Sequence, residues 1–521
     1  MLSFKTLTQS PIPSRIKLKN DFFKGSKSYG LIVLFSLIYS CSNEPDYYTD
    51  SDGLTYYNDL KEISAEVTVN PTGIAPLTAN IDVSMNLEHS ISISIKGKNN
   101  DDITHDFETT GFRHKIPVLG LYSNHQNKVT ISAKDRSGII IGRKNLTIIT
   151  DSIPVTHQLP KIEIIASELS ERYTFVEHHK FFTKAIPLIF DRHGEVRWYL
   201  KFEENTGEFP FYIYSSDKIV VGNNAAPVYY HYNWLGEITK EVSLIEDDMT
   251  AHHSITPHPD GGDIVLIDNE ADIGSLIYHL DDNGGIIKSW NLNEILLDYL
   301  PEEQEMMIPG TDWFHSNYAV YDESDNSIIV SGRSSIGVIK LDYNTGVIKW
   351  ILGDHDKQWY QYAGLRAVAL QPTVGTELPL GQHSPIKLPN GNILLMDNGW
   401  DGYERVGSED GLTNGGRQYS RLVEYSVDPE NLEVTQVFEF GKSYGTQLYS
   451  QYVGNTGYDT ELGSIWGIFG AVINPTTREN PTIEGHILEL DQSGGVLFHA
   501  KVLSESGTDF NYRTEKINFY K

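Results

Sequence analysis

The 521-residue sequence contains one cysteine, Cys41. No disulfide can therefore form within the chain, so the fold has to rest on its core alone. Positive charge is also scarce, because 41 Lys and Arg residues stand against 70 Asp and Glu residues, which gives a net charge of −29. This charge argues against nucleic acid and against an anionic membrane surface as partners.

The apolar run at residues 30–38 is too short to span a bilayer. Basic residues precede it, which is typical of a signal peptide. The run ends at Ile38-Tyr39-Ser40-Cys41, which resembles a bacterial lipobox apart from the bulky Tyr39. We expect residues 1–40 to be a lipoprotein signal peptide, Cys41 to be lipidated and residues 41–61 to form an acidic tether. An ordinary buried cysteine behind a cleaved signal is the alternative.

These features predict a protein that is lipid-anchored in a bacterial cell envelope. The lipid would hold it at the outer membrane, in the periplasm or on the cell surface, and would be its only contact with a membrane. The sequence leaves open which side the protein faces and whether it forms a homodimer.

The composition favours an all-β protein, since 30 tyrosines and 44 glycines suit strands and tight turns. Apolar residues alternate with polar ones at 63–69, 81–85, 91–95 and 129–133. Such alternation, with turn residues between the segments, predicts a small N-terminal β-sandwich over residues 62–152. Residues 153–160 have the composition of a linker.

From about residue 162 a different pattern repeats. The unit is an apolar strand, an Asp/Asn-x-x-Gly turn and a second apolar strand that often ends in Trp, most clearly at residues 339–350. Further copies lie at 186–198, 232–238, 280–287, 422–427 and 488–497. Repeated hairpins at this spacing predict a six-bladed β-propeller over residues 162–521.

Three histidines occupy nearly the same place in this repeat. His253 and His383 are each followed by serine, an apolar stretch and Pro-Asp/Asn-Gly, and His315 begins a looser copy. A residue that recurs at one place in a repeat recurs at one place in space, so we expect these histidines to face one another across the central channel. Arg333 comes 18 residues after His315, at the end of the next strand, where it can reach the same site.

Three imidazoles and one guanidinium suit an anion with several oxygens, such as sulfate or phosphate. A neutral imidazole can also act as a nucleophile or general base near pH 7. A metal site with three histidines is the first alternative, although the charge of Arg333 would repel a divalent cation. A channel that binds a ligand without turning it over is the second. A metal-dependent lactonase or hydrolase would need repeated acidic ligands, which the sequence lacks.

Several segments together resemble one known family. They are residues 70–77 and 118–122, His252-His253, residues 312–317, Ser331-Gly332-Arg333 and Gly381-Gln382-His383-Ser384. Their order and spacing are similar to those of bacterial aryl sulfotransferases that do not use PAPS, over essentially the whole chain from residue 62.

The resemblance implies a ping-pong reaction without a cofactor or a metal. A phenolic sulfate ester would transfer its sulfuryl group to His383, and a phenolic acceptor would then remove it from the sulfohistidine. The other active-site residues of the family fall on His253, His315 and Arg333. Some members carry a disulfide near the site, which this chain cannot form.

Chemical roles follow from this assignment. Arg333 and His253 would donate to the sulfuryl oxygens, His315 would protonate the leaving phenoxide and later deprotonate the acceptor, and Asn317 would add a substrate-binding donor. Four aromatic residues could stack on an aryl ring, although large aromatic residues more often belong to the core: Trp313, Phe314, Trp466 and Phe469. Activity is expected to fall below about pH 6.5, where an unperturbed histidine gains a proton. The alternative to an enzyme is a non-catalytic surface lipoprotein whose propeller binds a sulfated or phenolic ligand or a glycan.

Overall fold

The structure is a computed structural model that describes residues 47–49, 55–57, 63–168, 172–180, 184–202, 208–215, 218–223, 226–245, 248–300, 312–400, 416–473, 482–504 and 507–520. The predicted signal peptide, Cys41 and most of the predicted tether lie outside the described residues. The chain forms two compact units, and the boundary between them along the sequence lies between Ile153 and Pro154.

Within its described residues, the first unit contains strands and no helix, as the alternating pattern predicts. Two short strands, β1 (Tyr47–Thr49) and β2 (Thr55–Tyr57), pair with each other. The main strands are β3 (Ile63–Val69), β4 (Ala79–Ile95), β5 (Ile103–Val118), β6 (His125–Lys134) and β7 (Ile140–Thr150).

Two features of this unit differ from the sequence pattern. The apolar segments at 81–85 and 91–95 belong to one continuous strand, β4, which pairs with β3 over its first half and with β6 over its second half. β5 pairs with β4 on its other side, with register shifts near the middle. Only three of the sixteen β5 residues are buried and half are exposed, so the strand carries little apolar alternation that would reveal it.

The second unit contains six sheets within the described residues, the number of predicted repeats. The first three are β9 (Tyr173–Lys180), β10 (Lys184–Phe190) and β11 (Val196–Tyr199) with β33 (Phe510–Ile517); β12 (Glu208–Ser215), β13 (Lys218–Asn223), β14 (Val228–Asn233) and β15 (Ile238–Ser243); and β16 (Thr250–Pro257), β17 (Asp263–Asp268), β18 (Leu276–Leu280) and β19 (Ile286–Asn291).

The other three sheets continue in chain order. They are β20 (Ser316–Asp322), β21 (Ser327–Gly332), β22 (Val338–Asp342) and β23 (Ile348–Leu352); β24 (Gln371–Pro372), β25 (His383–Lys387), β26 (Ile393–Asp397), β27 (Arg421–Asp428) and β28 (Glu433–Phe440); and β29 (Asn455–Tyr458), β30 (Ile465–Ile473), β31 (Ile483–Leu490) and β32 (Val496–Leu503) with β8 (Lys161–Ser167).

Helices are short and lie between strands. They are α1 (Leu292–Leu297), α2 (Ala363–Arg366) and the 3-10 turns η1 (Val155–His157), η2 (Gln358–Gln361) and η3 (Lys442–Gln447). In the part of the chain that the structure describes, no helix has the length and apolarity needed to cross a membrane.

The repeated Asp/Asn-x-x-Gly segment forms a tight hairpin between the third and fourth strands of a sheet. In the β18–β19 hairpin, Asp281 Oδ1 accepts hydrogen bonds from the backbone N–H groups of Asn283 (2.7 Å) and Gly285 (2.8 Å). Gly284 has a φ of 85°, a conformation that favours glycine. In the degraded copy no glycine is available, and Leu432 takes a φ of 51° instead.

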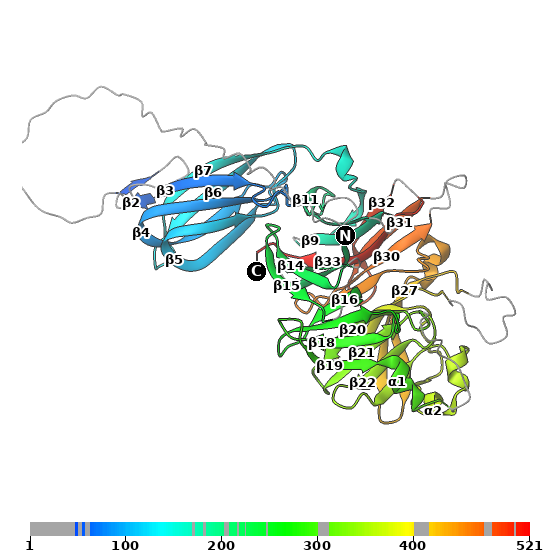
Figure 1. Ribbon diagram of the computed structural model, residues 1–521. Helices are drawn as coiled ribbons and strands as arrows, with labels where there is room; N and C mark the ends of the chain where they lie inside the picture. The colour runs from blue at the N-terminus through cyan, green and yellow to red at the C-terminus, as the bar shows by residue number, and fades with distance from the viewer. Residues whose placement is uncertain are drawn as a thin grey trace, which may run out of the picture. The chain divides into compact units, whose positions relative to one another are not determined.

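The inner strands of the sheets lie side by side in series, and the first sheet contacts the second through β10 and β12. β12 contacts β16, β16 contacts β20, β20 contacts β25, β25 contacts β29 and β29 contacts β33. β33 comes from the C-terminus and is the inner strand of the first sheet, next to β9 (Figure 1). β8, which precedes the first sheet, pairs with β32 at the outer edge of the last. Both ends of the unit therefore close the ring, which is the propeller-like arrangement that the repeats predict.

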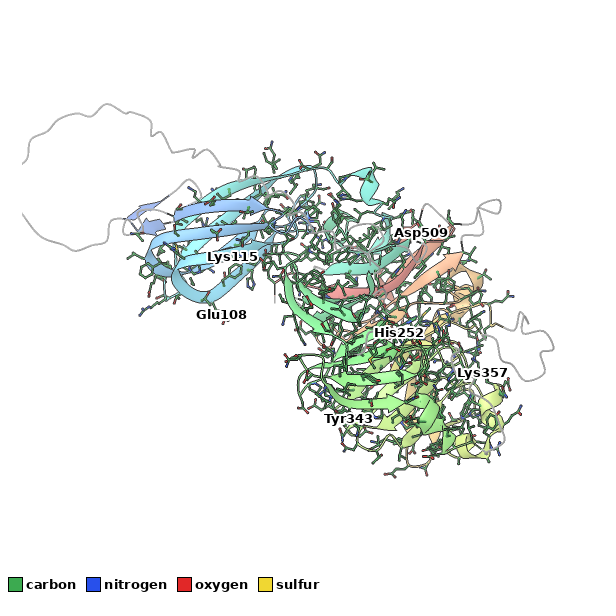
Figure 2. All side chains as sticks on the ribbon, in the orientation of Figure 1. Glu108, Lys115, His252, Tyr343, Lys357 and Asp509 are labelled. Atoms are coloured by element: carbon green, nitrogen blue, oxygen red, sulfur yellow. The ribbon has the colours of Figure 1, made fainter. Side chains whose placement is uncertain are left out.

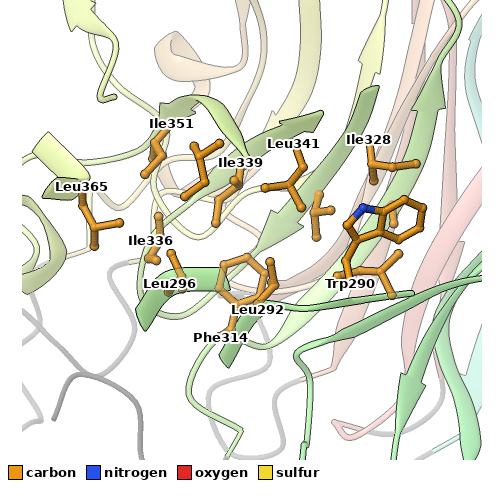
Figure 3. Packing of buried hydrophobic residues seen from close by; sticks show 14 of the residues in the cluster. Trp290, Leu292, Leu296, Phe314, Ile328, Ile336, Ile339, Leu341, Ile351 and Leu365 are labelled. Carbon is orange, nitrogen blue, oxygen red and sulfur yellow. The ribbon is translucent and has the colours of Figure 1, made fainter. Parts of the chain in front are cut away.

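A hydrophobic core fills the space between the third and fourth sheets. α1 contributes Leu292 and Leu296, and Phe314 packs with them (Figure 3). Phe314 is fully buried, and a Cβ at Gly332 would lie 2.4 Å from its ring. Glycine at position 332 is therefore required for this packing.

The aromatic residues expected to stack on an aryl substrate are instead part of the core. Trp313 and Phe314 belong to the cluster around α1, and Phe469 belongs to a second cluster between the fifth and sixth sheets. Trp466 is also buried. Their burial therefore agrees with the core alternative rather than with stacking on a substrate.

We expect Phe314→Ala to lower the free energy of unfolding by about 3–5 kcal/mol, because it leaves a cavity in a core that cannot collapse around it. Denaturant unfolding followed by tryptophan fluorescence measures the change. Ile287→Ala, at an exposed position, should shift it by less than about 0.5 kcal/mol. Equal effects of the two substitutions would contradict the assignment of Phe314 to the core.

Candidate functional site

His253 lies on β16, His383 begins β25 and His315 directly precedes β20, and these three inner strands are irregular at the same place. β16, β20 and β25 each shift register with the next strand there. His253, His315 and Ser384 have φ values of 51°, 54° and 48°, which are uncommon for residues other than glycine. In β16 the residue with positive φ is the histidine itself, His253, whereas in β25 it is Ser384, one residue after His383. The repeats are therefore equivalent only to within one residue. Strain of this kind clusters at functional sites.

The structure brings the predicted residues together at the hub. The ring centroids of His253 and His315 are 5.0 Å apart. The ring of Tyr512 lies 5.9 Å from that of His253 and 6.1 Å from that of His383. Arg333 donates its backbone N–H to the carbonyl of His315 at 3.1 Å. The predicted residues therefore meet at the hub of the second unit, where its inner strands come together.

The hydrogen bonds of Asn398 determine which nitrogen of His383 carries a proton. The amide Nδ2 of Asn398 donates to the carbonyls of Ser450 and Val453, both at 2.8 Å. These two bonds fix the amide so that Oδ1, which can only accept, lies 2.7 Å from His383 Nδ1. The neutral ring is therefore protonated at Nδ1 and has its lone pair on Nε2, which makes no hydrogen bond to any described residue.

The surroundings also keep His383 neutral. Burial lowers its pKa, the positive charge of Arg333 lowers it further, and the hydrogen bond from Nδ1 to Asn398 only partly offsets them, so that the pKa is about 3. The expected loss of activity below about pH 6.5 assumed an unperturbed histidine and is wrong for this residue. Near neutral pH, His383 offers an unprotonated nucleophile.

His315 is paired with a carboxylate. Its Nδ1 lies within hydrogen-bonding distance of Asp312 Oδ2, and both side chains are partly exposed at the rim of the site. A carboxylate on Nδ1 leaves Nε2 to exchange a proton with a ligand and stabilises the imidazolium that forms. This arrangement suits a general acid and base.

His253 is held from two sides. Its backbone carbonyl accepts a hydrogen bond from Arg513 of β33. Its ring Nδ1 lies 2.9 Å from Nδ1 of His252. Burial lowers the pKa of His253 well below its usual value, and the positive charges of His315, His252 and Arg513 lower it further. His253 is therefore neutral when the site holds no anion.

Asn317 lies beneath the site rather than at its surface. It is fully buried, and its Nδ2 donates to the carbonyl of Gln382 at 2.8 Å. Gln382 in turn donates to the carbonyl of Gly332 at 3.0 Å. These two bonds join the segments that precede His383 and Arg333, which favours a positioning role for Asn317 over contact with substrate.

Sequence reasoning missed five residues of the site: Asp268, Asp312, Asn398, Tyr512 and Arg513. Asp268 belongs to it because its Oδ1 lies 3.2 Å from Nε2 of His252. A signal for two of them exists, because Asp-Asn ends the second strand in both clear histidine repeats, at residues 268–269 and 397–398. The fourth sheet has Gly332-Arg333 at this place. Tyr512 and Arg513 belong to no repeat, and only the return of β33 to the hub brings them in.

Metal ligation finds no support at the hub. Within the described ranges, no group of three or more His, Cys, Asp or Glu side chains is arranged to hold a metal ion. Arg333 adds a permanent positive charge beside the histidines, and Arg513 adds a second that is partly offset by Glu177, whose Oε2 lies 3.6 Å from Arg513 Nη1. The site is thus suited to an anion.

Comparison with known sequences identifies the family. The profile described as "Arylsulfotransferase (ASST)" matches residues 161–513, and "Arylsulfotransferase Ig-like domain" matches residues 66–150. The chain belongs to the arylsulfotransferase family. The family membership predicted from the sequence is confirmed, and with it the prediction of an enzyme of the arylsulfate sulfotransferase type.

Two curated relatives of this family match most of the chain. The arylsulfate sulfotransferase AssT of Escherichia coli O6:H1 (strain CFT073) is 23% identical over 86% of this chain and 91% of its own length. AssT of Lelliottia amnigena is 22% identical over the same shares. Among solved structures, a protein of unknown function from Bacteroides caccae aligns with a TM-score of 0.39 at 13% identity, over 64% of this chain and 94% of that one. The periplasmic gluconolactonase of Pseudomonas aeruginosa aligns with a TM-score of 0.34 at 11% identity, over 67% and 99%. Likeness at this level carries no functional argument.

We expect the His383 ring to stay neutral, with its proton on Nδ1, from pH 8 down to about pH 5, because its pKa is about 3. Nitrogen NMR of protein labelled at histidine measures both the tautomer and the titration. Asn398→Ala removes the acceptor and should abolish the preference for Nδ1. A His383 midpoint near 6.5, or a proton on Nε2, would contradict the geometry.

Proposed function

We propose that this protein transfers a sulfuryl group from a phenolic sulfate ester to a phenolic acceptor by a ping-pong reaction through a sulfohistidine at His383. The observation that carries the proposal is the lone pair on Nε2 of His383, created by the hydrogen bond from its Nδ1 to Asn398 and maintained by burial beside Arg333. A group held neutral in this way is available as a nucleophile throughout the neutral range.

In the first half-reaction, Nε2 of His383 forms a bond to sulfur as the bond between sulfur and the phenolic oxygen breaks. The leaving phenoxide takes a proton from His315, whose imidazolium is stabilised by Asp312. Arg333 donates to the sulfuryl oxygens and offsets their charge. In the second half-reaction, His315 removes the proton of the acceptor phenol, and the phenoxide oxygen takes the sulfuryl group from Nε2.

This proposal is favoured over a binding protein without catalysis. Binding of an anion needs the charges of Arg333 and Arg513 but not a neutral histidine with a fixed tautomer beside them. The family to which the chain belongs also supports transfer. We further propose that Cys41 carries the predicted lipid anchor, on the strength of the lipobox-like sequence before it.

We expect His383→Ala to abolish transfer and Arg333→Ala to lower it by about 10²–10³-fold, the usual effect of removing one donor to a developing negative charge. The assay follows nitrophenolate release from nitrophenyl sulfate with phenol as acceptor. Release that does not require phenol would indicate a sulfatase instead. Full activity of His383→Ala would exclude the mechanism.

The rate of the donor half-reaction should not fall as the pH is lowered from 7 to 5. The pKa of His383 is lowered to about 3, so its ring stays unprotonated over this range. Rapid mixing with nitrophenyl sulfate, without acceptor, measures the burst of nitrophenolate. A loss of rate with a midpoint near pH 6.5 would show that the nucleophile is a histidine with an ordinary pKa.

A further inference from the structure

His252 and Asp268 lie behind His253 and connect it to a carboxylate (His252 is labelled in Figure 2). Adjacent residues of a strand normally point to opposite faces of the sheet. Here the register shift of β16 and the positive φ of His253 allow the two neighbouring rings to meet, with their Nδ1 atoms 2.9 Å apart. On the far side of His252, Nε2 lies 3.2 Å from Asp268 Oδ1. The three side chains therefore form one line from the end of β17 to the hub.

This line determines the proton positions. Asp268 Oδ1 accepts the backbone N–H of Gly274 at 2.5 Å, which fixes that oxygen in place. The contact of Asp268 with His252 Nε2 has the distance of an ion pair but not the geometry of a hydrogen bond. The negative charge at this distance still favours the tautomer of His252 that carries its proton on Nε2 and presents a lone pair at Nδ1. His253 must then donate from its own Nδ1. In the neutral state, Nε2 of His253 consequently bears a lone pair and cannot donate to a sulfuryl oxygen.

We propose that Asp268 and His252 are positioning residues that act through His253: they fix its tautomer and provide the negative charge that lets it take up a proton at Nε2 when an anionic sulfuryl group binds. The inference rests on the proposed function, because the sulfuryl group supplies the anion. The proton comes from solvent, binds Nε2 and turns His253 into a donor on both ring nitrogens.

The charges around His253 make this uptake depend on the ligand. The titratable and charged groups near it are His252, Asp268, His315, Asp312, His383, Tyr512, Arg513 and Arg333. Without a ligand, the cationic neighbours and burial oppose a further positive charge. A bound anion offsets the arginines, and Asp268 balances the imidazolium through His252. Uptake of the proton is thereby coupled to binding of the anion.

The test is calorimetric titration of the purified full-length protein with inorganic sulfate at about pH 7.5, in buffers of different ionisation enthalpy, which gives the number of protons taken up. The wild type should take up about one proton per sulfate. Asp268→Asn keeps an oxygen for Gly274 and His252 but removes the charge. It should take up almost none and bind sulfate about tenfold more weakly, the effect of one pKa unit.

Two further variants make the result specific. The amide oxygen of the glutamine in His252→Gln can accept a hydrogen bond from His253 Nδ1. The amide cannot take up a proton and so does not link His253 to the carboxylate of Asp268, and this variant should behave like Asp268→Asn. Asp282→Asn removes an equal charge at an exposed turn and should behave like the wild type. Uptake that persists in Asp268→Asn would place the proton on His315 and overturn the inference, as would binding to the wild type without uptake.

If inorganic sulfate binds too weakly to titrate, kcat/KM for nitrophenyl sulfate answers the same question. The proton that His315 donates affects the wild type and Asp268→Asn alike, so the comparison of the two is decisive. Between pH 9 and 7, kcat/KM should rise more steeply in the wild type than in Asp268→Asn, by about tenfold per pH unit, because one further proton enters with the donor. Equal slopes in two proteins that transfer sulfuryl groups would overturn this inference alone. A protein without any transfer would overturn the proposed function.

Discussion

The hydrogen bond between Asn398 and His383 is the contact on which the chemistry of the hub depends. An amide partner accepts the Nδ1 proton but, unlike a carboxylate, adds no negative charge, so it stabilises a positive ring only weakly. Asn398 therefore selects the tautomer of His383, while the buried surroundings and Arg333 keep the ring uncharged. His315 has the opposite partner, the carboxylate of Asp312, which favours a ring that can gain and lose a proton. Two histidines at the same place of two different repeats are thus given different chemistry by the residues behind them.

A buried histidine that stays neutral lowers the stability of the folded protein in acid. The folded-state pKa of His383 lies below its unfolded value, so the unfolded chain binds more protons between about pH 3 and 6.5. Stability accordingly decreases as the pH falls through that window. The ring of sheets has to bear this cost without disulfides, and it does so by closing twice, with β33 at the hub and β8 at the outer edge. The same closure brings Arg513 and Tyr512 into the site.

Much of the fold and of the site could be predicted because the sequence of the second unit repeats. The Asp/Asn-x-x-Gly turns have one physical cause, a side-chain oxygen that caps backbone N–H groups, and the histidines recur at one place in the unit. What could not be predicted lies outside the repeat. His178 and Asn511 form a hydrogen bond across more than 300 residues of sequence, and no periodic pattern predicts that the last strand joins the first sheet. The pairing of His252 with His253 depends on a register shift, which sequence alternation cannot show.

The most direct test of the central claim is to find the sulfuryl group on the protein. The purified enzyme is mixed with nitrophenyl sulfate without an acceptor, digested at neutral pH and examined by mass spectrometry. We predict a sulfuryl group on His383 that is lost when phenol is added before digestion. Two results would contradict transfer through His383. One is a sulfuryl group on another residue, and the other is no sulfuryl group on a protein that turns over the same donor when phenol is present.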